Sequence, residues 1–265
     1  MLEKFIINKK ICYILGGCGL IGEHVVELFS RFNVKIVILD IDKKKAKEIS
    51  SKNNNIFFEY FNCNSKKDLT IKINNIFNEH GCPHIFINCS HPTPKKLKNK
   101  SFANLDKDLL DDYVKIHMNS SAWIARVIAE KMFRSKIKGS LILFSSIYGM
   151  LGQDMNIYNN TKMSESVPYS LIKGGIINYV RQMASYYGKY NIRVNCISPG
   201  GLQGHVKGSK NKQDKLFIKN YNKKVPIGRL AKPEEIAYST LFLASNASSY
   251  ITGHNLVIDG GWSII

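Results

Sequence analysis

Short runs of apolar residues, many of them β-branched, alternate along the chain with longer segments whose apolar positions recur at a helical period. The runs predicted to be strands are residues 11–15, 35–39, 56–61, 85–88, 140–144, 193–197 and 255–258. The predicted helices cover residues 20–31, 42–51, 66–79, 168–187 and 233–244, with one or two more between 105 and 133. Such alternation predicts parallel strands that are joined by right-handed crossovers and covered by helices on both faces. We therefore expect an α/β fold, a doubly wound Rossmann-type sheet of seven parallel strands, in a single domain that spans residues 1–265.

Two segments interrupt this alternation. Residues 149–167 are polar and rich in turn-forming residues, and residues 200–225 are rich in glycine and lysine. Each follows the carboxyl end of a predicted strand, which is where open α/β sheets bind their ligands. We expect these two segments to be the substrate loops.

The composition excludes several classes of protein. Hydrophobic residues make up 44% of the 265 residues, enough for a sizeable core, but no uninterrupted apolar run is long enough to span a membrane. The first ten residues lack the apolar centre of a signal peptide, so we expect a cytoplasmic protein that does not bind membranes. The six cysteines form no CxxC pair and most lie in apolar runs, which indicates reduced thiols and no metal site.

The net charge of +18 raises the question of a nucleic-acid partner. The lysines, however, are spread along the chain among asparagines, as in the run from Lys52 to Asn55, without interleaved aromatic residues or a known binding module. We expect no nucleic-acid partner. Weak steering of anionic substrates remains open.

A glycine-rich turn lies between the first predicted strand and the first predicted helix. Its sequence is Gly16-Gly17-Cys18-Gly19-Leu20-Ile21-Gly22. Glycines in this position permit a tight turn and let backbone N–H groups approach a pyrophosphate at a helix N-terminus. We expect Gly16, Cys18, Leu20 and Ile21 to contact a dinucleotide.

The second predicted strand is followed by Asp40. A carboxylate there can accept hydrogen bonds from both ribose hydroxyls of NAD and would repel the 2′-phosphate of NADP. Residue 41 is Ile rather than Arg or Lys, so we expect NAD(H) to be preferred over NADP(H). Two alternatives stay open: Asp40 only caps the next helix, or the nearby Lys43 to Lys45 accept the phosphate.

The candidate catalytic residues are Ser146, Tyr169 and Lys173. Tyr169 and Lys173 are four residues apart and share one face of a predicted helix. An ammonium near a phenol favours the phenolate and lowers its pKa, so the pair could exchange a proton as hydride moves. Ser146 ends the fifth predicted strand, where its hydroxyl can hold the substrate oxygen.

Together these features resemble the short-chain dehydrogenase/reductase family over nearly the whole chain. The matching positions are Gly16 to Gly22, Asp40, Asn88, Ser146, Tyr169, Lys173, the run from Asn195 to Gly201, and Ile258 to Gly261.

The resemblance implies a role for each of these positions. Ser146 would orient the substrate oxygen, Tyr169 would be the general acid and base, and Lys173 would contact the nicotinamide ribose and tune Tyr169. Pro199 and Gly200 would lie against the nicotinamide. Further cofactor contacts are expected at Asn62, Cys63 and Asn88. Homodimers or homotetramers would form through helices near residues 110–133 and 168–188.

The sequence also departs from the family pattern. Leu15 replaces a Thr before the glycines, which are spaced GxxGxxG, and Asn62 replaces an acid. The usual Asn-Asn-Ala-Gly segment reads Asn88-Cys89-Ser90-His91. The family's catalytic Asn is replaced by His117, with Asn119 two positions later, and either of them could fill that role.

The separation of Ser146 and Tyr169, 23 residues, is about ten more than most family members of this length have. A subgroup of flagellin-modification and surface-sugar oxidoreductases is similar in the glycine turn, in Ser-Ser-Ile-Tyr-Gly with its long insert, and in Asn-Cys-Ile-Ser-Pro-Gly-Gly. This resemblance suggests a small-molecule substrate of the sugar or nucleotide-sugar type.

Three alternatives remain open. GxxGxxG and the long insert are also found in nucleotide-sugar epimerases and dehydratases, although that branch carries a larger C-terminal domain. The altered segment after Asn88, with His117, is compatible with a non-catalytic NAD-sensing protein. A reductase of lipid or acyl intermediates is the third, and Asp40 counts against it because such reductases usually use NADP.

Overall fold

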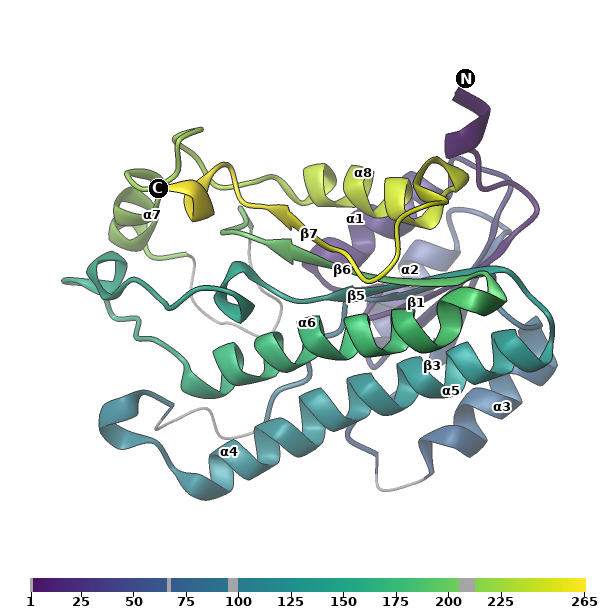
Figure 1. Ribbon diagram of the computed structural model, residues 1–265, viewed down its shortest axis with the longest axis horizontal. Coiled ribbons are helices and arrows are strands. Elements are labelled where there is room, and N and C mark those ends of the chain that lie inside the picture. The colour runs from purple at the N-terminus through teal and green to yellow at the C-terminus, as the bar shows by residue number, and fades with distance from the viewer. Residues whose placement is uncertain (1, 66–67, 95–99, 205–212) are drawn as a thin grey trace.

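A sheet of seven parallel strands forms the centre of the molecule (Figure 1). The computed structural model describes residues 2–65, 68–94, 100–204 and 213–265. The strands follow the order β3-β2-β1-β4-β5-β6-β7, and each neighbouring pair is parallel. Their bounds are β1 Ile11–Leu15, β2 Lys35–Asp40, β3 Ile56–Tyr60, β4 Ile85–Asn88, β5 Gly139–Phe144, β6 Ile192–Pro199 and β7 Asn255–Ile258. The predicted Rossmann-type α/β fold is confirmed.

Helices cover both faces of this sheet (Figure 1). On one face α1, α2 and α8 pack against strand residues such as Ile14 and Ile38; on the other, α3, α5 and α6 pack against Leu15 and Leu39. The strands are therefore buried on both sides, which explains why they are nearly continuous apolar runs rather than alternating ones. The helices are α1 Leu20–Phe29, α2 Lys43–Ser50, α3 Leu69–His80, α4 Lys107–Tyr113, α5 Ser120–Arg134, α6 Val167–Tyr187, α7 Lys215–Asn222 and α8 Pro233–Ala244.

The predicted helical region between residues 105 and 133 is continuous through an irregular turn. A π-helical turn, Val114–Asn119, joins α4 to α5 without a loop. Turns of this kind displace the following side chains from the ordinary helical register, and they are frequent at functional sites. This one contains His117.

The prediction of residues 200–225 as a loop is wrong for α7, Lys215–Asn222. The Asp214 carboxylate caps this helix by accepting hydrogen bonds from the N–H groups of Leu216 and Phe217. The buried Tyr221 stacks on Trp262 with ring centroids 4.3 Å apart. A short helix rich in Lys and Asn depends on such tertiary packing, which hydrophobic periodicity does not reveal. Residues 205–212 of this loop, and residues 66–67 of the third predicted helix, lie outside the described residues.

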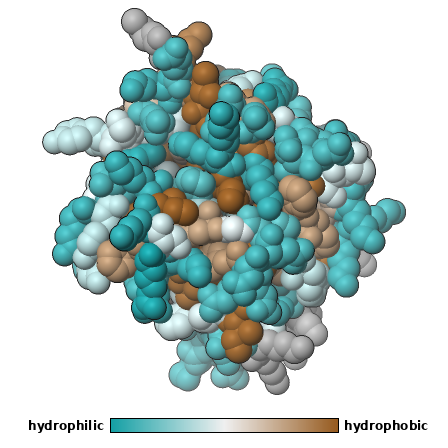
Figure 2. Space-filling model, turned by 90° about the vertical axis from the view of Figure 1, so that its right-hand side faces the viewer, coloured by the Kyte–Doolittle hydropathy of each residue, from teal (hydrophilic) through white to brown (hydrophobic). Residues whose placement is uncertain are grey.

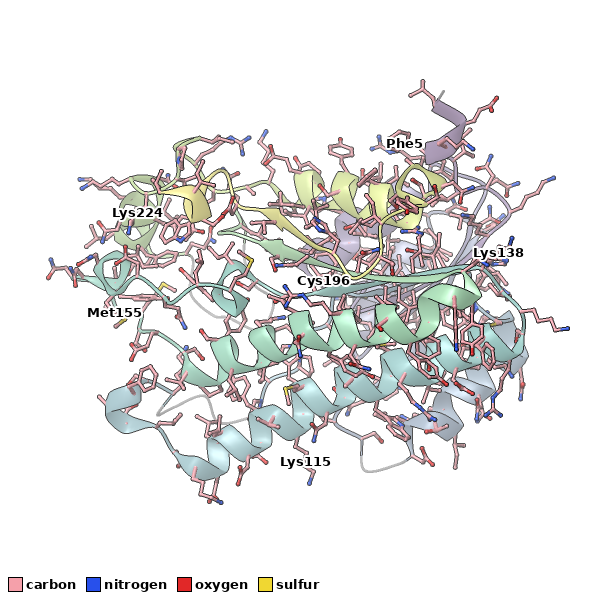
Figure 3. All side chains as sticks on the ribbon, viewed as in Figure 1. Phe5, Lys115, Lys138, Met155, Cys196 and Lys224 are labelled. Atoms are coloured by element: carbon pink, nitrogen blue, oxygen red, sulfur yellow. The ribbon has the colours of Figure 1, made fainter. Side chains whose placement is uncertain are left out.

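The surface seen from the amino-terminal ends of the strands is largely hydrophilic. Figure 2 shows hydrophobic residues on this face as small separate groups among polar ones. Within the described part of the chain, no helix is both long and apolar enough to cross a membrane. The carboxyl ends of the strands lie on the opposite side, near Met155 and Lys224 in Figure 3, whereas Lys138 marks the amino end of β5.

Candidate active site

The glycine-rich turn after β1 packs too closely against the loop after β4 for a side chain at Gly16. Gly16 has a φ of +79°, and a Cβ atom there would lie 2.7 Å from the Cα atom of Ser90. The N-cap of α1 is Gly19, and no side chain caps that helix end. The N–H groups of Leu20 and Ile21 in its first turn are therefore open to an anion, and the positive end of the helix dipole favours one. The turn fits the pyrophosphate of a dinucleotide.

Asp40 at the end of β2 holds this turn in place. Its Oδ2 atom accepts a hydrogen bond from the N–H of Cys18 at 2.8 Å, and its Oδ1 atom accepts one from the N–H of Asp42 at 3.0 Å. The cap of α2 is Asp42, whose carboxylate accepts from the N–H of Lys45. The alternative that Asp40 only caps α2 is therefore wrong. A carboxylate has about four acceptor positions, so two remain for ribose hydroxyls.

Asn62, Cys63 and Asn88 lie around the same end of the sheet. Asn88 donates a hydrogen bond to Ser121 Oγ at 3.2 Å and accepts two from the N–H and hydroxyl of Ser90. Burial raises the pKa of the Cys63 thiol to about 12, against the effect of a hydrogen bond with Ser90. Asn62 accepts a hydrogen bond from the backbone two residues later. These contacts fix the loops after β3 and β4 beside Asp40.

Ser146, Tyr169 and Lys173 come together at the carboxyl end of β5. Ser146 follows this strand, and its Oγ atom accepts from the N–H of Tyr148 at 3.2 Å. Lys173 is buried; its Nζ atom donates to the carbonyl of Phe144 at 2.9 Å and lies 5.5 Å from the centroid of the Tyr169 ring. The strand end and α6 thus bring the three predicted catalytic side chains into one cluster.

The joint between the strand end and α6 is tightly packed at Gly149. A Cβ atom at Gly149 would lie 2.7 Å from the backbone carbonyl group of Lys173 and 2.7 Å from Ser145 Oγ. The same Lys173 carbonyl accepts a hydrogen bond from the Ser145 hydroxyl at 2.8 Å. Only glycine lets the chain after Ser146 approach the helix this closely.

The pKa of Tyr169 is raised in the structure, whereas the sequence predicts that Lys173 lowers it. Burial raises the pKa of Tyr169, and a hydrogen bond with Ser146 opposes that shift. Burial lowers the pKa of Lys173 to about 8, opposed by the thiols of Cys89 and Cys196. The predicted lowering of the Tyr169 pKa by Lys173 is not found, because burial is the largest effect on this phenol. The Lys173 ammonium donates to the Phe144 carbonyl. Tyr169 is therefore a neutral phenol near pH 7.

The buried His117 and the more exposed His91 extend the cluster. The ring of His91 meets Tyr169 edge-on with centroids 5.5 Å apart, and the ring of His117 meets His91 in the same way at 4.8 Å. Burial and the charge of Lys173 lower the pKa of His91 to about 3 and lower that of His117 as well. The Nδ1 atom of His117 is buried without a hydrogen-bond partner among the described residues. Asn119 instead lines a groove between α5 and α6, so His117 is the residue that the π-helical turn brings to the cluster.

A cavity of about 270 Å³ adjoins Ser146 and Tyr169. Both interrupting segments, 149–167 and 200–225, contribute to its walls. The lining residues are Lys100, Ser146, Ile147, Tyr148, Gln153, Tyr158, Met163, Ser164, Ser166, Tyr169, Gly200, Gly201, Phe217 and Tyr221. Pro199 ends β6 immediately before Gly200. The cavity therefore lies over the strand ends where the reacting groups gather.

Several residues of the site and its cavity give little or no signal in the sequence. Tyr148 stands in the Ser-Ser-Ile-Tyr-Gly run, which indicates a family resemblance but no role for this side chain. His91 departs from the family pattern, and that departure by itself indicates no role. Tyr221 reaches the cavity from α7, and its hydroxyl accepts a hydrogen bond from the N–H of Gly201 at 2.6 Å. Lys100 gave no signal, because a lone lysine in a Lys-rich segment does not stand out.

A parallel sheet in this order, an uncapped glycine turn and a Ser-Tyr-Lys cluster define a nicotinamide-dependent oxidoreductase of the Rossmann type. Residues 19–263 match the family model described as enoyl-(acyl carrier protein) reductase. The chain belongs to the short-chain dehydrogenase/reductase family, whose members act on hydroxyl or ketone groups with NAD(P).

Three similar proteins illustrate the range of this family. Post-translational flagellin modification protein A of Campylobacter coli is 25% identical over 97% of this chain and 100% of its own length. The 3-oxoacyl-[acyl-carrier-protein] reductase FabG of Chlamydia muridarum is 28% identical over 98% of this chain and 99% of its own. A short-chain dehydrogenase from Leptospira borgpetersenii, solved with bound NAD⁺, is 29% identical, covers 98% of this chain and 95% of its own, and superposes with a TM-score of 0.84.

Proposed function

We propose that this protein transfers hydride between NAD(H) and a hydroxyl or ketone group of a sugar or nucleotide sugar. The observation that carries the proposal is the cavity in which Ser146 and Tyr169 share a wall with many hydrogen-bonding side chains. The catalytic residues would be Ser146, Tyr169 and Lys173.

The cofactor would be held along the carboxyl ends of the strands. The first turn of α1 would bind the pyrophosphate, Asp40 the adenosine ribose, and Pro199 with Gly200 would lie against the nicotinamide. Bound NAD(H) would accept or supply the hydride. Asp40 supports NAD(H) over NADP(H), because its carboxylate would repel a 2′-phosphate.

Proton transfer would fall to Tyr169. The Ser146 hydroxyl would hold the substrate oxygen beside the phenol. Because burial raises the pKa of Tyr169, its neutral form prevails near pH 7 and is ready to donate a proton to the oxygen of a ketone as negative charge develops there. The charged form of Lys173, close to the ring, would stabilise the phenolate that results. This arrangement favours reduction.

The cavity walls support a polyhydroxylated substrate. The hydroxyl of Tyr148 is buried and interacts with the Tyr158 phenol without a hydrogen bond of ordinary geometry, so a substrate hydroxyl would complete its hydrogen bonding. Tyr158 and Phe217 stack 5.9 Å apart beside it, and aromatic faces of this kind suit the C–H faces of a sugar ring. Gln153, which accepts from the Tyr158 hydroxyl, adds a further polar group. Similarity to a post-translational flagellin modification protein supports a substrate that is used in such a modification.

A second candidate is reduction of an acyl-chain ketone, which the FabG relative favours. One assay separates the two. Purified protein is mixed with NADH or NADPH and either a panel of keto-sugars, with and without a nucleotide, or acetoacetyl thioesters, and absorbance at the nicotinamide band is followed. The proposal predicts oxidation of NADH with a keto-sugar. Turnover confined to the thioesters and NADPH would contradict it, and NAD-dependent conversion without net NADH change would indicate an epimerase.

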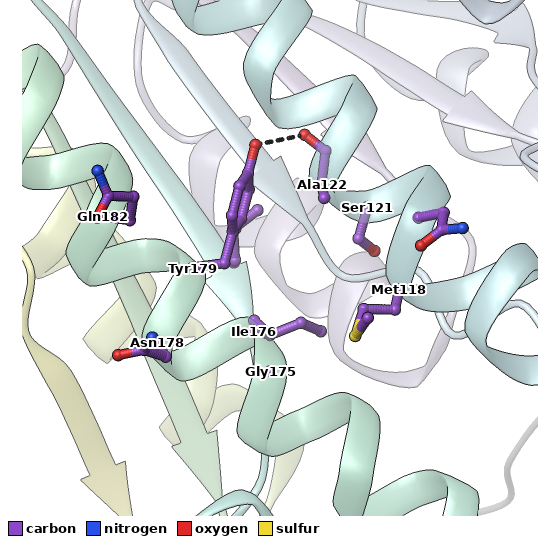
Figure 4. A pocket seen from close by; sticks show the side chains of 10 residues that line it. Met118, Ser121, Ala122, Gly175, Ile176, Asn178, Tyr179 and Gln182 are labelled. Atoms are coloured by element: carbon purple, nitrogen blue, oxygen red, sulfur yellow. Dashed lines mark hydrogen bonds between the residues drawn. The ribbon is translucent and has the colours of Figure 1, made fainter.

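We also propose a cytoplasmic homodimer or homotetramer that pairs through α5 and α6. Figure 4 shows the groove between these helices, where the Tyr179 hydroxyl donates to the carbonyl of Ala122 at 2.9 Å. The groove measures about 370 Å³, and Trp123 and Leu171 on the same helices are 47% and 51% exposed. Large exposed apolar side chains support an interface. Light scattering on the purified protein tests this, and a monomer at micromolar concentration would contradict it.

A further inference from the structure

The substrate cavity contains one charged side chain among its described lining residues, that of Lys100. The other lining groups are hydroxyls, one amide, aromatic rings and apolar side chains. A cation in an otherwise neutral cavity creates a local preference for anions, because the low-dielectric walls weaken screening.

The backbone at Lys100 is held against the start of α6. Its carbonyl accepts a hydrogen bond from the N–H of Val167 at 3.0 Å. Two residues later the N–H of Phe102 donates to the carboxylate of Glu165 at 3.2 Å. These two bonds join the Lys100 segment to residues two and four positions before Tyr169. The backbone of Lys100 is therefore held close to the catalytic tyrosine.

Lys100 lines the same cavity as Ser146 and Tyr169. Its charge contributes to the lowered pKa of His91, whose ring contacts Tyr169 edge-on at 5.5 Å. A charge that acts on His91 is also close enough to act on a substrate that contacts Tyr169. The hydroxyls of Ser164 and Ser166 line the same cavity and can add hydrogen bonds to an anion.

Lys100 also lacks a counter-charge within the described residues. Lys45 pairs with Glu23, and Lys224 pairs with Asp154 at the edge of the insert, whereas no ion pair includes Lys100. The nearby Glu165 carboxylate accepts from the Phe102 backbone instead. Lys100 is partly buried, and a bound anion would supply the counter-charge that the described residues do not.

We propose that Lys100 is an anion-binding subsite, so that the substrate carries a carboxylate or phosphate close to the group that is oxidised or reduced. The inference deepens the proposed function and rests on it. It restricts the substrate class to acidic or phosphorylated sugars and excludes neutral sugars as the preferred ligands. The high net charge of the chain, +18, would assist the approach of such substrates.

Three six-carbon polyols that differ in one group test the subsite: sorbitol, gluconate and sorbitol 6-phosphate. Their binding to the protein saturated with NAD is measured by calorimetry. We expect at least one anion to bind about tenfold or more tighter than sorbitol, and this preference to shrink as salt rises from about 50 to 500 mM. Tighter binding of gluconate alone would identify a carboxylate, and of the phosphate ester alone a phosphate.

Variants assign the preference to Lys100. K100A should bind the three polyols equally, K100R should keep most of the preference, and the exposed Lys138→Ala at the amino end of β5 should behave as wild type. The subsite is overturned if the wild type binds both anions no more tightly than sorbitol, or binds neither anion detectably. It is also overturned if K100A keeps the wild-type preference for anions. Turnover of a keto-sugar is measured in parallel with wild type and Tyr169→Phe, so that failure of the subsite can be told apart from failure of the proposed function. If wild type turns over and Tyr169→Phe does not, the proposed function holds even where the subsite fails.

Discussion

Replacement of Asp40 by Ser should reverse or abolish the choice between NAD and NADP. In the structure this carboxylate accepts two backbone N–H groups, from Cys18 and Asp42, and has acceptor positions left for a ribose. Serine keeps a small acceptor at the site but removes the charge. The variant therefore loses the ribose interactions of NAD and also the repulsion of a 2′-phosphate.

The size of the change follows from these contacts. A hydrogen bond to a charged group contributes about 1.5–3 kcal/mol, so loss of the ribose bonds should weaken NAD binding by about 2–3 kcal/mol, or ~30- to 150-fold. A carboxylate about 5 Å from a phosphate of charge near −2 repels it by about 1.5 kcal/mol even in water, so removing it should strengthen NADP binding ~10-fold. The ratio of the two dissociation constants should change by ~100-fold or more. Loss of the Cys18 and Asp42 contacts affects both cofactors and leaves the ratio unaltered.

The dissociation constants of NADH and NADPH can be measured by fluorescence for the wild type, Asp40→Ser and the matched control Asp42→Ser. Asp42 caps α2, and serine also caps helices, so the control should keep the wild-type ratio. A ratio in Asp40→Ser within about threefold of wild type would refute the reasoning, as would a wild type that prefers NADPH.

Three further predictions concern the cluster around the catalytic residues. The lowered pKa keeps the buried His117 neutral, so its NMR resonances should not titrate between pH 5 and 8; a midpoint near the ordinary ~6.5 would contradict this burial. Lys173, with a pKa of about 8, loses its charge as pH rises through that value, so kcat/KM for ketone reduction should fall above about pH 8; an undiminished rate at pH ~9.5 would show that the charge is not needed. Gly149→Ala forces a Cβ against the backbone of Lys173 and should cost about 1–3 kcal/mol of unfolding free energy, seen as a lower Tm, whereas Gly152→Ala, whose Cβ would meet nothing within 4 Å, should not; equal Tm values for the two variants would contradict the close packing.

Most of the sheet could be predicted from the sequence, because strands covered by helices on both faces are continuous apolar runs. The bounds of β1, β4 and β7 agree with the predicted ranges, and β6 extends to Pro199. The chain order of turn, acid, serine and Tyr-x-x-x-Lys also placed the candidate residues at the correct edge, since the carboxyl ends of parallel strands share it.

The remainder of the site depends on packing that a single sequence does not display. Helix α7 is fixed by the stacking of Tyr221 on Trp262, which are far apart in the chain. Whether His117 or Asn119 reaches the catalytic cluster depends on the π-helical turn, which shifts the register of the helix in a way that a period of 3.6 residues does not predict. The spacing of Tyr169 and Lys173 predicts a lowered phenol pKa, whereas burial raises it and the hydrogen bond with Ser146 opposes that shift.

In the proposed reaction Tyr169 donates the proton when a ketone is reduced. The most direct test of this step compares single-turnover oxidation of bound NADH in the wild type, in Tyr169→Phe and in the control Tyr250→Phe, whose ring is fully exposed. The account predicts that Tyr169→Phe binds NADH within a few-fold of wild type but reduces the ketone about 10²–10⁴-fold more slowly, while Tyr250→Phe is unchanged. Turnover by Tyr169→Phe at a rate close to that of the wild type would contradict it.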